Sequence, residues 1–95
     1  MEIVYTTDAF ISLTALINFI ETKNTYGAGS RWLNGYEIFL KKALAIPQKR
    51  KICNNATFKR FGLHCLSYHE WIIAFSVHEN YVLFEAILHK SRISN

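Results

Sequence analysis

Apolar side chains recur at helical spacing in the first half of the chain and at alternating positions in the second half. Residues 2–6 form a short β-branched and aromatic run that predicts a strand. The helical spacing that follows predicts a first helix over residues 8–23 and a second helix that begins near Gly29 and ends before Pro47. Because only a short glycine-containing turn separates the two helices, we expect them to form an antiparallel hairpin.

Alternation of apolar and polar residues begins after a polar and basic segment, residues 48–57, which we expect to be a loop. The alternation predicts strands that are separated by short turns, at 58–61, 63–69, 71–77 and 81–89. In the turn between the last two strands, His78-Glu79-Asn80, we expect Asn80 to adopt the left-handed backbone conformation.

The predicted order of elements is β-α-α-β-β-β, which indicates a single α+β domain over residues 1–95. We expect an N-terminal strand and a two-helix antiparallel hairpin packed on one face of a small, mostly antiparallel sheet. Gly35 lies inside the second helix, where glycine costs up to about 1 kcal/mol relative to alanine. Close packing of Gly35 against the first helix would explain its presence.

The period-two pattern of the last two strands predicts which side chains face the helices. We define the helix-covered side of the sheet as the inner face and the opposite side as the outer face. The inner face is expected to carry Trp71, Ile73, Phe75, Val77, Val82, Phe84, Ala86 and Leu88. The outer face is expected to carry Ile72, Ala74, Ser76, His78, Tyr81, Leu83, Glu85, Ile87 and His89. The outer face is therefore largely apolar, and its carboxylate would repel phosphate.

Hydrophobic residues make up 51% of the chain and charged residues 19%, which excludes a disordered protein. The net charge is +4, and most basic residues lie within residues 41–60, which contain no acidic residue. A surface of one sign attracts polyanions or acidic proteins, so nucleic acid, the ribosome and an acidic protein are candidate partners, alongside a solvated surface without any partner. The basic residues of this window are Lys41, Lys42, Lys49, Arg50, Lys51, Lys59 and Arg60.

The two cysteines, Cys53 and Cys65, lie outside any CxxC pattern. The chain begins Met-Glu, without the basic and apolar segments of a secretory signal, and no apolar run approaches the roughly 18 residues of a membrane span. We therefore expect a reduced cytoplasmic protein with two ordinary thiols. Whether the two cysteines approach each other does not follow from the sequence.

A metal site that combines Cys53, His64, Cys65 and His69 is not expected. His64 and His69 point to opposite faces of one strand, and Cys65 and His69 lie about 13 Å apart along it. Zinc requires its four ligands within about 2.3 Å of one point. We expect neither a metal nor another cofactor.

RNA cleavage without a metal requires a general base, a general acid and cations that bind the phosphate. These groups have to converge on one surface, and the outer face is the natural place. Between Ile72 and Ile87, that face offers only apolar groups, one hydroxyl and one carboxylate. The pattern therefore favours binding over catalysis and leaves catalysis as the alternative. The candidate catalytic groups are Arg60, Tyr68, His69, His89 and Arg92.

Several segments of the chain occur in an order and spacing that is typical of a known family. They are the opening strand EIVYT, the helix after Thr7-Asp8-Ala9, the helix that ends before Pro47, the strand pair around Trp71–Val77, and the closing Ile87-Leu88-His89-Lys90-Ser91-Arg92, which is similar to the pattern I-x-H-x-x-R. On these features, over nearly all of its 95 residues, the chain resembles the RelE/ParE superfamily of toxins from bacterial type II toxin–antitoxin systems.

The resemblance implies a small basic toxin that a cognate antitoxin holds inactive by wrapping it with a helix and an extended segment. RelE-like members cleave mRNA in the ribosomal A site with basic side chains on the sheet, whereas ParE-like members inhibit DNA gyrase. The strand of this family often reads aromatic-Arg-apolar-apolar-Tyr, and here Ile72 replaces the arginine and Phe75 the tyrosine. The apolar residue at the arginine position resembles the ParE-like branch.

The resemblance therefore predicts a cytoplasmic ParE-like toxin that inhibits growth by binding DNA gyrase and contributes to plasmid stabilisation. One alternative is a RelE-like, ribosome-dependent mRNA endonuclease that uses Arg60, His69, His89 and Arg92. The other is a non-toxic relative that only binds a partner. We expect no membrane and no small-molecule substrate. Contacts to the antitoxin or the target are expected from Lys49, Arg50, Lys51, Lys59, Arg60, His89, Lys90 and Arg92.

Overall fold

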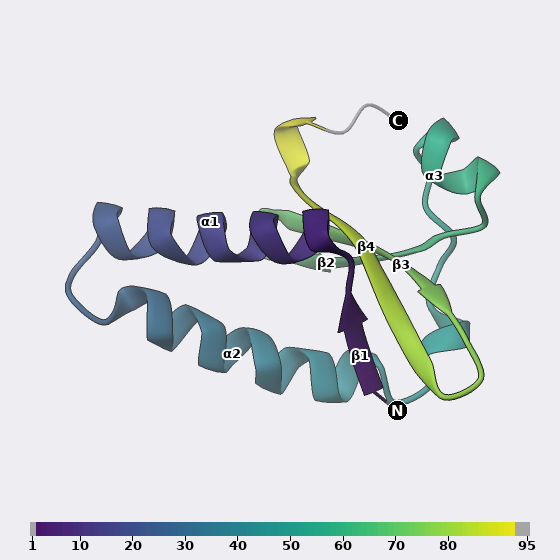
Figure 1. The fold of residues 1–95 in the computed structure, drawn as a ribbon, viewed down its shortest axis with the longest axis horizontal. Helices are drawn as coiled ribbons and strands as arrows, with labels where there is room; N and C mark the ends of the chain where they lie inside the picture. Colours follow the sequence, from purple (N-terminus) through teal and green to yellow (C-terminus); the bar gives the residue numbers. More distant parts are fainter. Residues whose placement is uncertain (1, 93–95) are drawn as a thin grey trace.

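The computed structural model describes residues 2–92, which form a four-stranded sheet covered on its inner face by two long helices (Figure 1). Short helical segments follow the second long helix, precede the second strand and end the described chain. The elements in chain order are β1 (Glu2–Tyr5), α1 (Thr7–Lys23), α2 (Ala28–Ala43), η1 (Pro47–Lys49), α3 (Ala56–Arg60), β2 (His64–Tyr68), β3 (Trp71–Val77), β4 (Tyr81–His89) and η2 (Lys90–Arg92).

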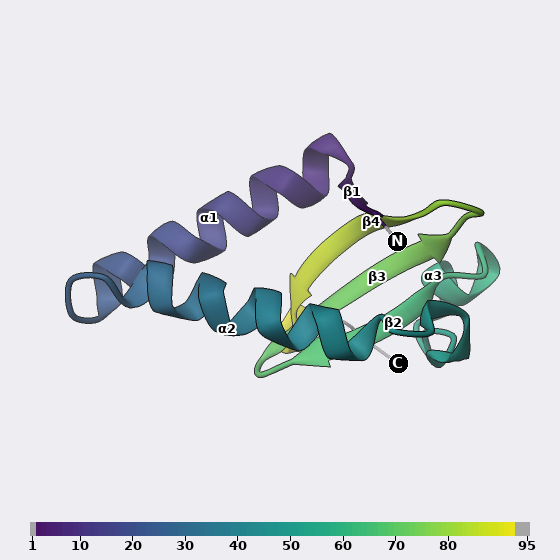
Figure 2. The ribbon, with the colours of Figure 1, turned by 90° about the horizontal axis from the view of Figure 1, so that it is seen from below.

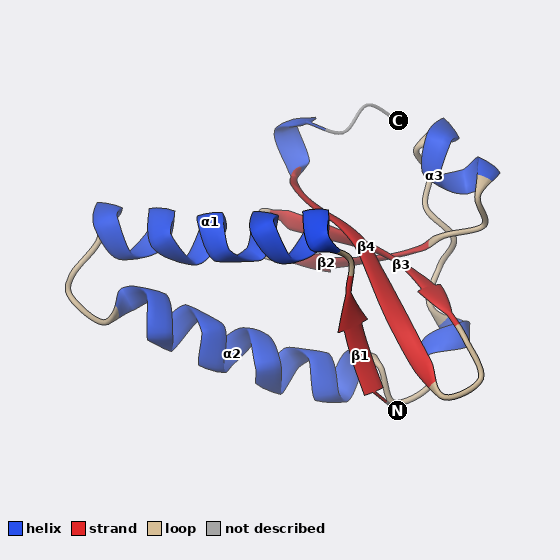
Figure 3. Ribbon diagram, viewed as in Figure 1, coloured by secondary structure: helices blue, strands red, loops and turns tan. Residues whose placement is uncertain are grey.

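The strands are arranged in the order β1-β4-β3-β2, so the first strand of the chain lies beside the last one (Figure 3). β1 runs parallel to β4, whereas the β4–β3 and β3–β2 pairs are antiparallel. The helices and the segment after them carry the chain from the β1 edge of the sheet to the β2 edge. The predicted α+β fold, with a helical hairpin on one face of a mostly antiparallel sheet, is confirmed.

The first helix begins at a side-chain cap. The Oγ1 atom of Thr6 accepts a hydrogen bond from the backbone N–H of Ala9 at 3.1 Å and donates one to the carbonyl oxygen of Glu85 at 3.3 Å. A hydroxyl in this position satisfies one of the N–H groups that the first turn of a helix leaves without a partner. Its second bond attaches the start of α1 to β4.

The two long helices approach each other closely at Gly29, near the start of α2. A Cβ atom there would lie 3.0 Å from the carbonyl oxygen of Ile17 in α1. Gly35 instead faces β2, where a Cβ atom would lie 2.8 Å from the hydroxyl oxygen of Tyr68. The prediction that Gly35 packs against the first helix is therefore wrong, because α2 turns that position toward the sheet.

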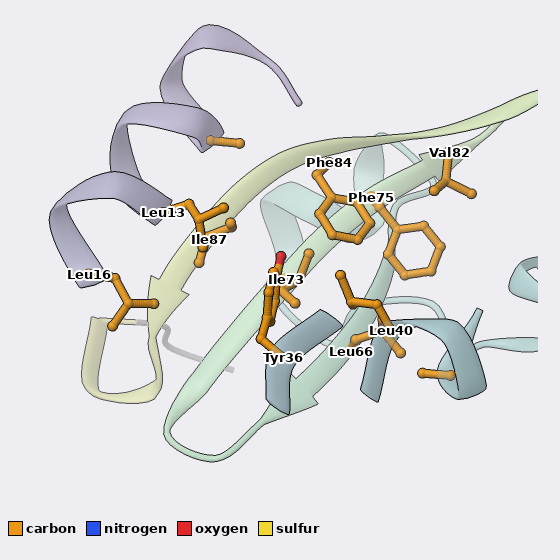
Figure 4. Packing of buried hydrophobic residues seen from close by; sticks show 12 residues of the cluster. Leu13, Leu16, Tyr36, Leu40, Leu66, Ile73, Phe75, Val82, Phe84 and Ile87 are labelled. Atoms are coloured by element: carbon orange, nitrogen blue, oxygen red, sulfur yellow. The ribbon is translucent and has the colours of Figure 1, made fainter. Parts of the chain in front are cut away.

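The main core lies between the inner face and the α1–α2 hairpin (Figures 2 and 4). The rings of Phe75 and Phe84 lie next to each other there, with centroids 5.9 Å apart (Figure 4). Large aromatic side chains supply much of the apolar burial in so small a domain. The largest fully buried side chains are Tyr36, Ile73, Phe75, Val82 and Phe84.

A β-bulge interrupts the alternation of β4. Ala74 of β3 pairs with Ala86, whereas the next residue, Phe75, pairs with Phe84, so Glu85 is an extra residue in the ladder. An extra residue of this kind reverses which side chains of the strand face the core beyond it.

The bulge changes the predicted faces of the second half of β4. Ile87 and His89, which the alternation places on the outer face, lie on the inner face: Ile87 is buried in the main core, and the His89 ring packs on Trp71. Ala86 and Leu88, which the alternation places on the inner face, lie on the outer face. The predicted faces are therefore wrong after Glu85 and hold for β3, whose inner-face residues belong to the main core.

Residues 56–60 form the helix α3 rather than the strand that is predicted over residues 58–61. The Oδ1 atom of Asn55 accepts hydrogen bonds from the N–H groups of Thr57 at 3.0 Å and Phe58 at 3.2 Å, which caps the helix. Gly62, with a φ of 68°, turns the chain into β2. A four-residue alternation is too short to compete with this cap and turn.

The tight turns of the sheet also differ from the prediction. The β3–β4 turn is closed by a hydrogen bond from the N–H of His78 to the carbonyl of Tyr81 at 2.8 Å, and Asn80 does not adopt a positive φ. Among the described non-glycine residues, a positive φ occurs at His69, at 53°, in the β2–β3 turn. The prediction for Asn80 is wrong because this turn closes without a left-handed residue.

The segment between η1 and β2 covers part of the outer face. Its residues form a second, smaller core with the middle strands of the sheet. Ala74 and Ala86 supply the sheet side of this core, and their short side chains leave room for the covering segment. The buried members are Cys53, Leu63 and Ala74, with Phe58, Cys65 and Ala86 packed against them.

Cys53 and Cys65 form a disulfide bond, with Cα atoms 4.9 Å apart. An isolated antiparallel bridge between Ile52 and His64 brings the two segments together, and the residues that follow each of them point to the same face. The expectation of two ordinary thiols is therefore wrong, and the described chain has no free cysteine. The pairing depends on a bridge between segments that the local sequence pattern does not connect.

Candidate binding surfaces

The basic residues that the sequence selects fall into two groups along the chain. One group lies on η1, α3 and the segment between them, and the other lies on η2 at the end of β4. Figure 1 shows α3 and η2 as separate projections at the top of the view. We call the first group the basic segment; it contains Lys49, Arg50, Lys51, Lys59 and Arg60.

Most of the basic segment is free to meet a partner. The exception is Arg50, whose Nε atom donates a hydrogen bond to the carbonyl of Ala43 at 2.7 Å and so caps the end of α2. The other cations of the segment are exposed and, within residues 2–92, their side chains form no hydrogen bond or ion pair. Because no carboxylate of the described chain neutralises them, their field extends into solvent.

A cavity of about 240 Å³ lies on the outer face, between the basic segment and the sheet. Lys51 is its one lining residue that can titrate, because both lining cysteines are in the disulfide. Acid–base cleavage needs a base and an acid in addition to a cation. The cavity therefore lacks the groups for that chemistry. Its lining residues are Lys51, Ile52, Cys53, Asn54, Asn55, Phe58, Cys65, Ser67 and Ile72.

A groove of about 550 Å³ lies between α1 and the end of β4, and we call it the C-terminal groove. Its floor is apolar, its charged or titratable lining residues are His89 and Arg92, and no carboxylate of residues 2–92 lines it. Phe19, at its rim, is 56% exposed. The groove is lined by Ser12, Ala15, Leu16, Phe19, Trp71, Ile87, Leu88, His89, Ser91 and Arg92.

His89 is held in place by two neighbours. Its ring packs edge-to-face on Trp71, with centroids 5.1 Å apart. Its Nδ1 atom accepts a hydrogen bond from the backbone N–H of Ser91 at 3.1 Å and lies 2.8 Å from the Ser91 hydroxyl. Because a backbone N–H can only donate, the neutral ring carries its proton on Nε2. The I-x-H-x-x-R spacing of residues 87–92 thus produces a structural contact as well as a groove lining.

The candidate catalytic residues do not converge on one site. His89 and Arg92 line the C-terminal groove, whereas Arg60 lies on α3 and lines none of the cavities described here. His69 lies in the β2–β3 turn, where its ring packs on Tyr68 with centroids 4.3 Å apart. The Tyr68 ring in turn packs among the aromatic side chains of α2.

A third hollow, of about 580 Å³, lies beside β1, and the sequence pattern does not single out its residues. At its wall, the hydroxyl oxygens of Tyr5 and Tyr36 lie 2.9 Å apart and share a hydrogen bond. Burial, reinforced by that hydrogen bond, raises the pKa of Tyr36 far above its ordinary value, and burial also raises the pKa of Tyr5. The hollow is lined by Ile3, Tyr5, Glu37, Leu40, Lys41, Leu44, Ala45, Pro47 and Val82.

The hollow lies along an open edge of the sheet. Within residues 2–92, β1 pairs with β4 alone, and the N–H groups of Glu2 and Thr6 point toward that neighbour, donating to the carbonyls of Asn80 and Phe84 at 3.4 and 3.0 Å. In a strand, alternate residues direct their backbone groups to opposite sides, so those of Ile3 and Tyr5 point away from the sheet. An added strand would find its hydrogen-bond partners there.

Within residues 2–92, no three His, Cys, Asp or Glu side chains are grouped so as to hold a metal ion. None of the helices in this part of the chain has the length and apolar character needed to cross a membrane.

Comparison with known proteins identifies the fold. No protein-family model matches the sequence, and no curated protein does so either. A solved structure described as "Chromosomal ParDE TA system from P. aeruginosa" contains a similar chain, with a TM-score of 0.73 and 12% sequence identity. The similarity covers 94% of this chain and 95% of the other. The fold expected from the RelE/ParE resemblance is therefore confirmed: this chain has the fold of a component of a ParDE toxin–antitoxin system.

Proposed function

We propose that the protein is the toxin of a type II toxin–antitoxin system and that it is ParE-like. The observation that carries this proposal is the shared fold with a chain of a ParDE system, over 94% of the present chain. The uncompensated basic segment supports it, because a cationic surface is suited to an acidic antitoxin.

The chemistry of the outer face favours a toxin that binds its target without cleaving it. Ile72 lies where a nuclease of this family would place an arginine, and it lines a cavity whose titratable side chain is Lys51 alone. We therefore propose DNA gyrase as the target. The alternative is ribosome-dependent mRNA cleavage, for which His89 and Arg92 are the candidate groups that share a cavity.

The antitoxin would use the surfaces beside β1 and on the basic segment. An extended segment added to β1 would gain the backbone hydrogen bonds of Ile3 and Tyr5 and would cover the apolar hollow beside them. Acidic residues of the antitoxin would pair with the cations of the basic segment. We propose a cytoplasmic location, because DNA gyrase acts there.

Controlled expression tests the proposal. We expect the chain, expressed from a tightly repressed promoter, to stop growth, whereas the same gene with an early stop codon does not. Purified protein should inhibit DNA supercoiling by gyrase and leave ribosome-bound mRNA intact in primer extension. A neighbouring reading frame for a short acidic protein should restore growth when co-expressed.

The same assays identify each alternative. Codon-specific mRNA cleavage that is lost in His89→Ala or Arg92→Ala would replace gyrase inhibition by the RelE-like activity. Normal growth together with neither activity would indicate a relative that binds a partner without toxicity.

A further inference from the structure

We infer that the Cys53–Cys65 disulfide is a redox-responsive clasp. When oxidised, it holds residues 51–63 on the outer face; when reduced, it releases them. The release would loosen the basic segment and uncover the small core beneath it. The effect on partner binding rests on the proposed function, whereas the release of the segment does not.

Few noncovalent contacts fasten the start of the segment to β2. They are one isolated bridge, a backbone hydrogen bond from the N–H of Cys65 to the carbonyl of Lys51 at 2.9 Å, and a hydrogen bond at 2.7 Å between the His64 ring and the carbonyl of Arg50. A further backbone hydrogen bond, from the N–H of Cys53 to the carbonyl of Leu63 at 2.9 Å, lies within the segment itself. So short a ladder is marginal without further support.

Apolar packing beneath the segment is also limited. Leu63 is 5% exposed, and the sheet side of its cluster consists of small side chains, those of Cys65, Ala74 and Ala86. The stabilisation from burial scales with the apolar area removed from water, so the sheet side of this cluster contributes little. The covalent bond therefore supplies what packing and backbone pairing do not.

The disulfide is accessible from one side. Cys53 is 2% exposed, whereas Cys65 is partly exposed, and both line the 240 Å³ outer-face cavity. Of the two cysteines, Cys65 is therefore the one more open to a reductant that enters the cavity. Access to one sulfur is what thiol–disulfide exchange requires.

The reductant class that fits this step is a dithiol. One of its thiolates attacks the Cys65 sulfur, the bond to Cys53 breaks, and the departing Cys53 thiolate takes up a proton. The second thiol of the reductant then attacks the mixed disulfide and releases Cys65 as a thiol. Two electrons and two protons pass to the protein, and the dithiol becomes a disulfide.

The released segment carries most of the uncompensated cations of the basic segment. Lys51, Lys59 and Arg60 lie between or beside the two cysteines and form no ion pair in the described chain. In the oxidised protein their backbone is ordered before a partner arrives. After reduction, binding must also order the segment, which weakens it. The oxidised form is thus the tighter binder of a negatively charged partner.

Hydrogen exchange measured by mass spectrometry tests the release. In protein reduced with dithiothreitol, we expect amides of residues 51–63 to exchange about tenfold faster or more than in the oxidised protein, while β3 and β4 keep their protection. The Cys53→Ser, Cys65→Ser double variant should behave like the reduced protein. If that variant does not fold, the comparison of oxidised with reduced wild-type protein still tests the release of the segment. Equal protection of residues 51–63 in the oxidised and reduced protein would overturn the clasp.

Binding of a polyglutamate peptide tests the consequence. We expect about tenfold weaker binding after reduction, because ordering of the segment is then included in the binding free energy. Unchanged affinity would overturn the link between the clasp and binding. Neither result depends on toxicity, so a protein that is not a toxin could still possess the clasp, and a toxin could lack it.

Discussion

Glu21 connects the two long helices through its carboxylate. Its Oε2 atom accepts a hydrogen bond from the N–H of Gly27, and its Oε1 atom accepts one from the N–H of Gly29, both at 2.8 Å. These bonds satisfy N–H groups at the start of α2, where the positive end of the helix dipole also favours an anion. They hold the pKa of the Glu21 carboxyl below its ordinary value, and the nearby charge of Arg31 acts in the same direction.

The lowered pKa makes this contact sensitive to acid. Because the folded pKa lies below the unfolded one, the stabilisation is complete above about pH 4.5 and is lost as the pH falls through the folded value. We expect Glu21→Gln to lower the Tm near pH 7, and we expect this difference from the wild type to shrink as the pH falls toward about 3. Thermal unfolding followed by circular dichroism across this range measures it.

A matched control is available in the β3–β4 turn. Glu79 is exposed and forms no described hydrogen bond, so Glu79→Gln should leave the Tm unchanged at each pH. A constant Tm difference for Glu21→Gln over the whole range would show that the carboxylate charge does not contribute to the cap.

The packing of α1 on α2 depends on the absence of a side chain at Gly29. A methyl group there would meet both the backbone and the side chain of Ile17, at 3.0 and 3.1 Å. We expect Gly29→Ala to destabilise the protein by about 1–3 kcal/mol, because overpacking outweighs the better helix propensity of alanine. Urea unfolding gives this free energy. The exposed neighbour Ser30 supplies the control: Ser30→Ala should change stability little or improve it slightly.

The disulfide should contribute measurably to stability as well. It joins residues that are 12 positions apart, and closing a loop of about this size stabilises a protein by about 3 kcal/mol in the chain-entropy description. We expect the Cys53→Ser, Cys65→Ser double variant to lose about 2–3 kcal/mol in urea unfolding. Reduced wild-type protein is the natural comparison and should show a similar loss. Equal stability of all three forms would mean that packing alone holds the segment.

The whole molecule carries its charge unevenly. Its net charge of +4 arises largely from the basic segment and neighbouring α2, while the surfaces beside β1 and α1 are mainly apolar. Separate cationic and apolar surfaces suit a partner that contributes both acidic residues and an apolar segment. The charges control the rate and salt dependence of association, and the apolar areas supply much of the affinity.

Charge-reversal variants distinguish the contribution of the basic segment to binding from the contribution of the protein's net charge. We expect Arg60→Glu to weaken polyglutamate binding severalfold and to reduce its salt dependence, because a cation of the basic segment becomes a repelling anion. Lys23→Glu makes the same change in net charge at the end of α1 and should have a smaller effect. Fluorescence anisotropy at several salt concentrations measures both. Equal losses in the two variants would mean that net charge, not the basic segment, attracts the peptide.

Local patterns correctly predicted most elements of this fold. The apolar spacing of α1 and α2 and the alternation of β3 and β4 reflect contacts that each segment needs whatever its neighbours are. The same reasoning failed at residues 58–61, because four alternating residues carry too little information against an asparagine cap.

The candidate site was predicted less well. Sequence reasoning selected the exposed cations of the basic segment and the pair His89 and Arg92, which do line one groove. It placed His89 on the outer face, because an alternating pattern contains no sign of the bulge at Glu85. It could not identify the hollow beside β1, because no local feature shows that β1 lies at the sheet edge.

The sequence by itself determined the two long helices and the four strands, where charge accumulates and which residues are apolar enough to be buried. These properties depend on residues a few positions apart. The tertiary structure alone decided that β1 pairs with β4, that Glu85 forms a bulge and that Cys53 meets Cys65. Each of these joins segments that are distant along the chain, and only the packing of the complete molecule selects one such pairing over the others.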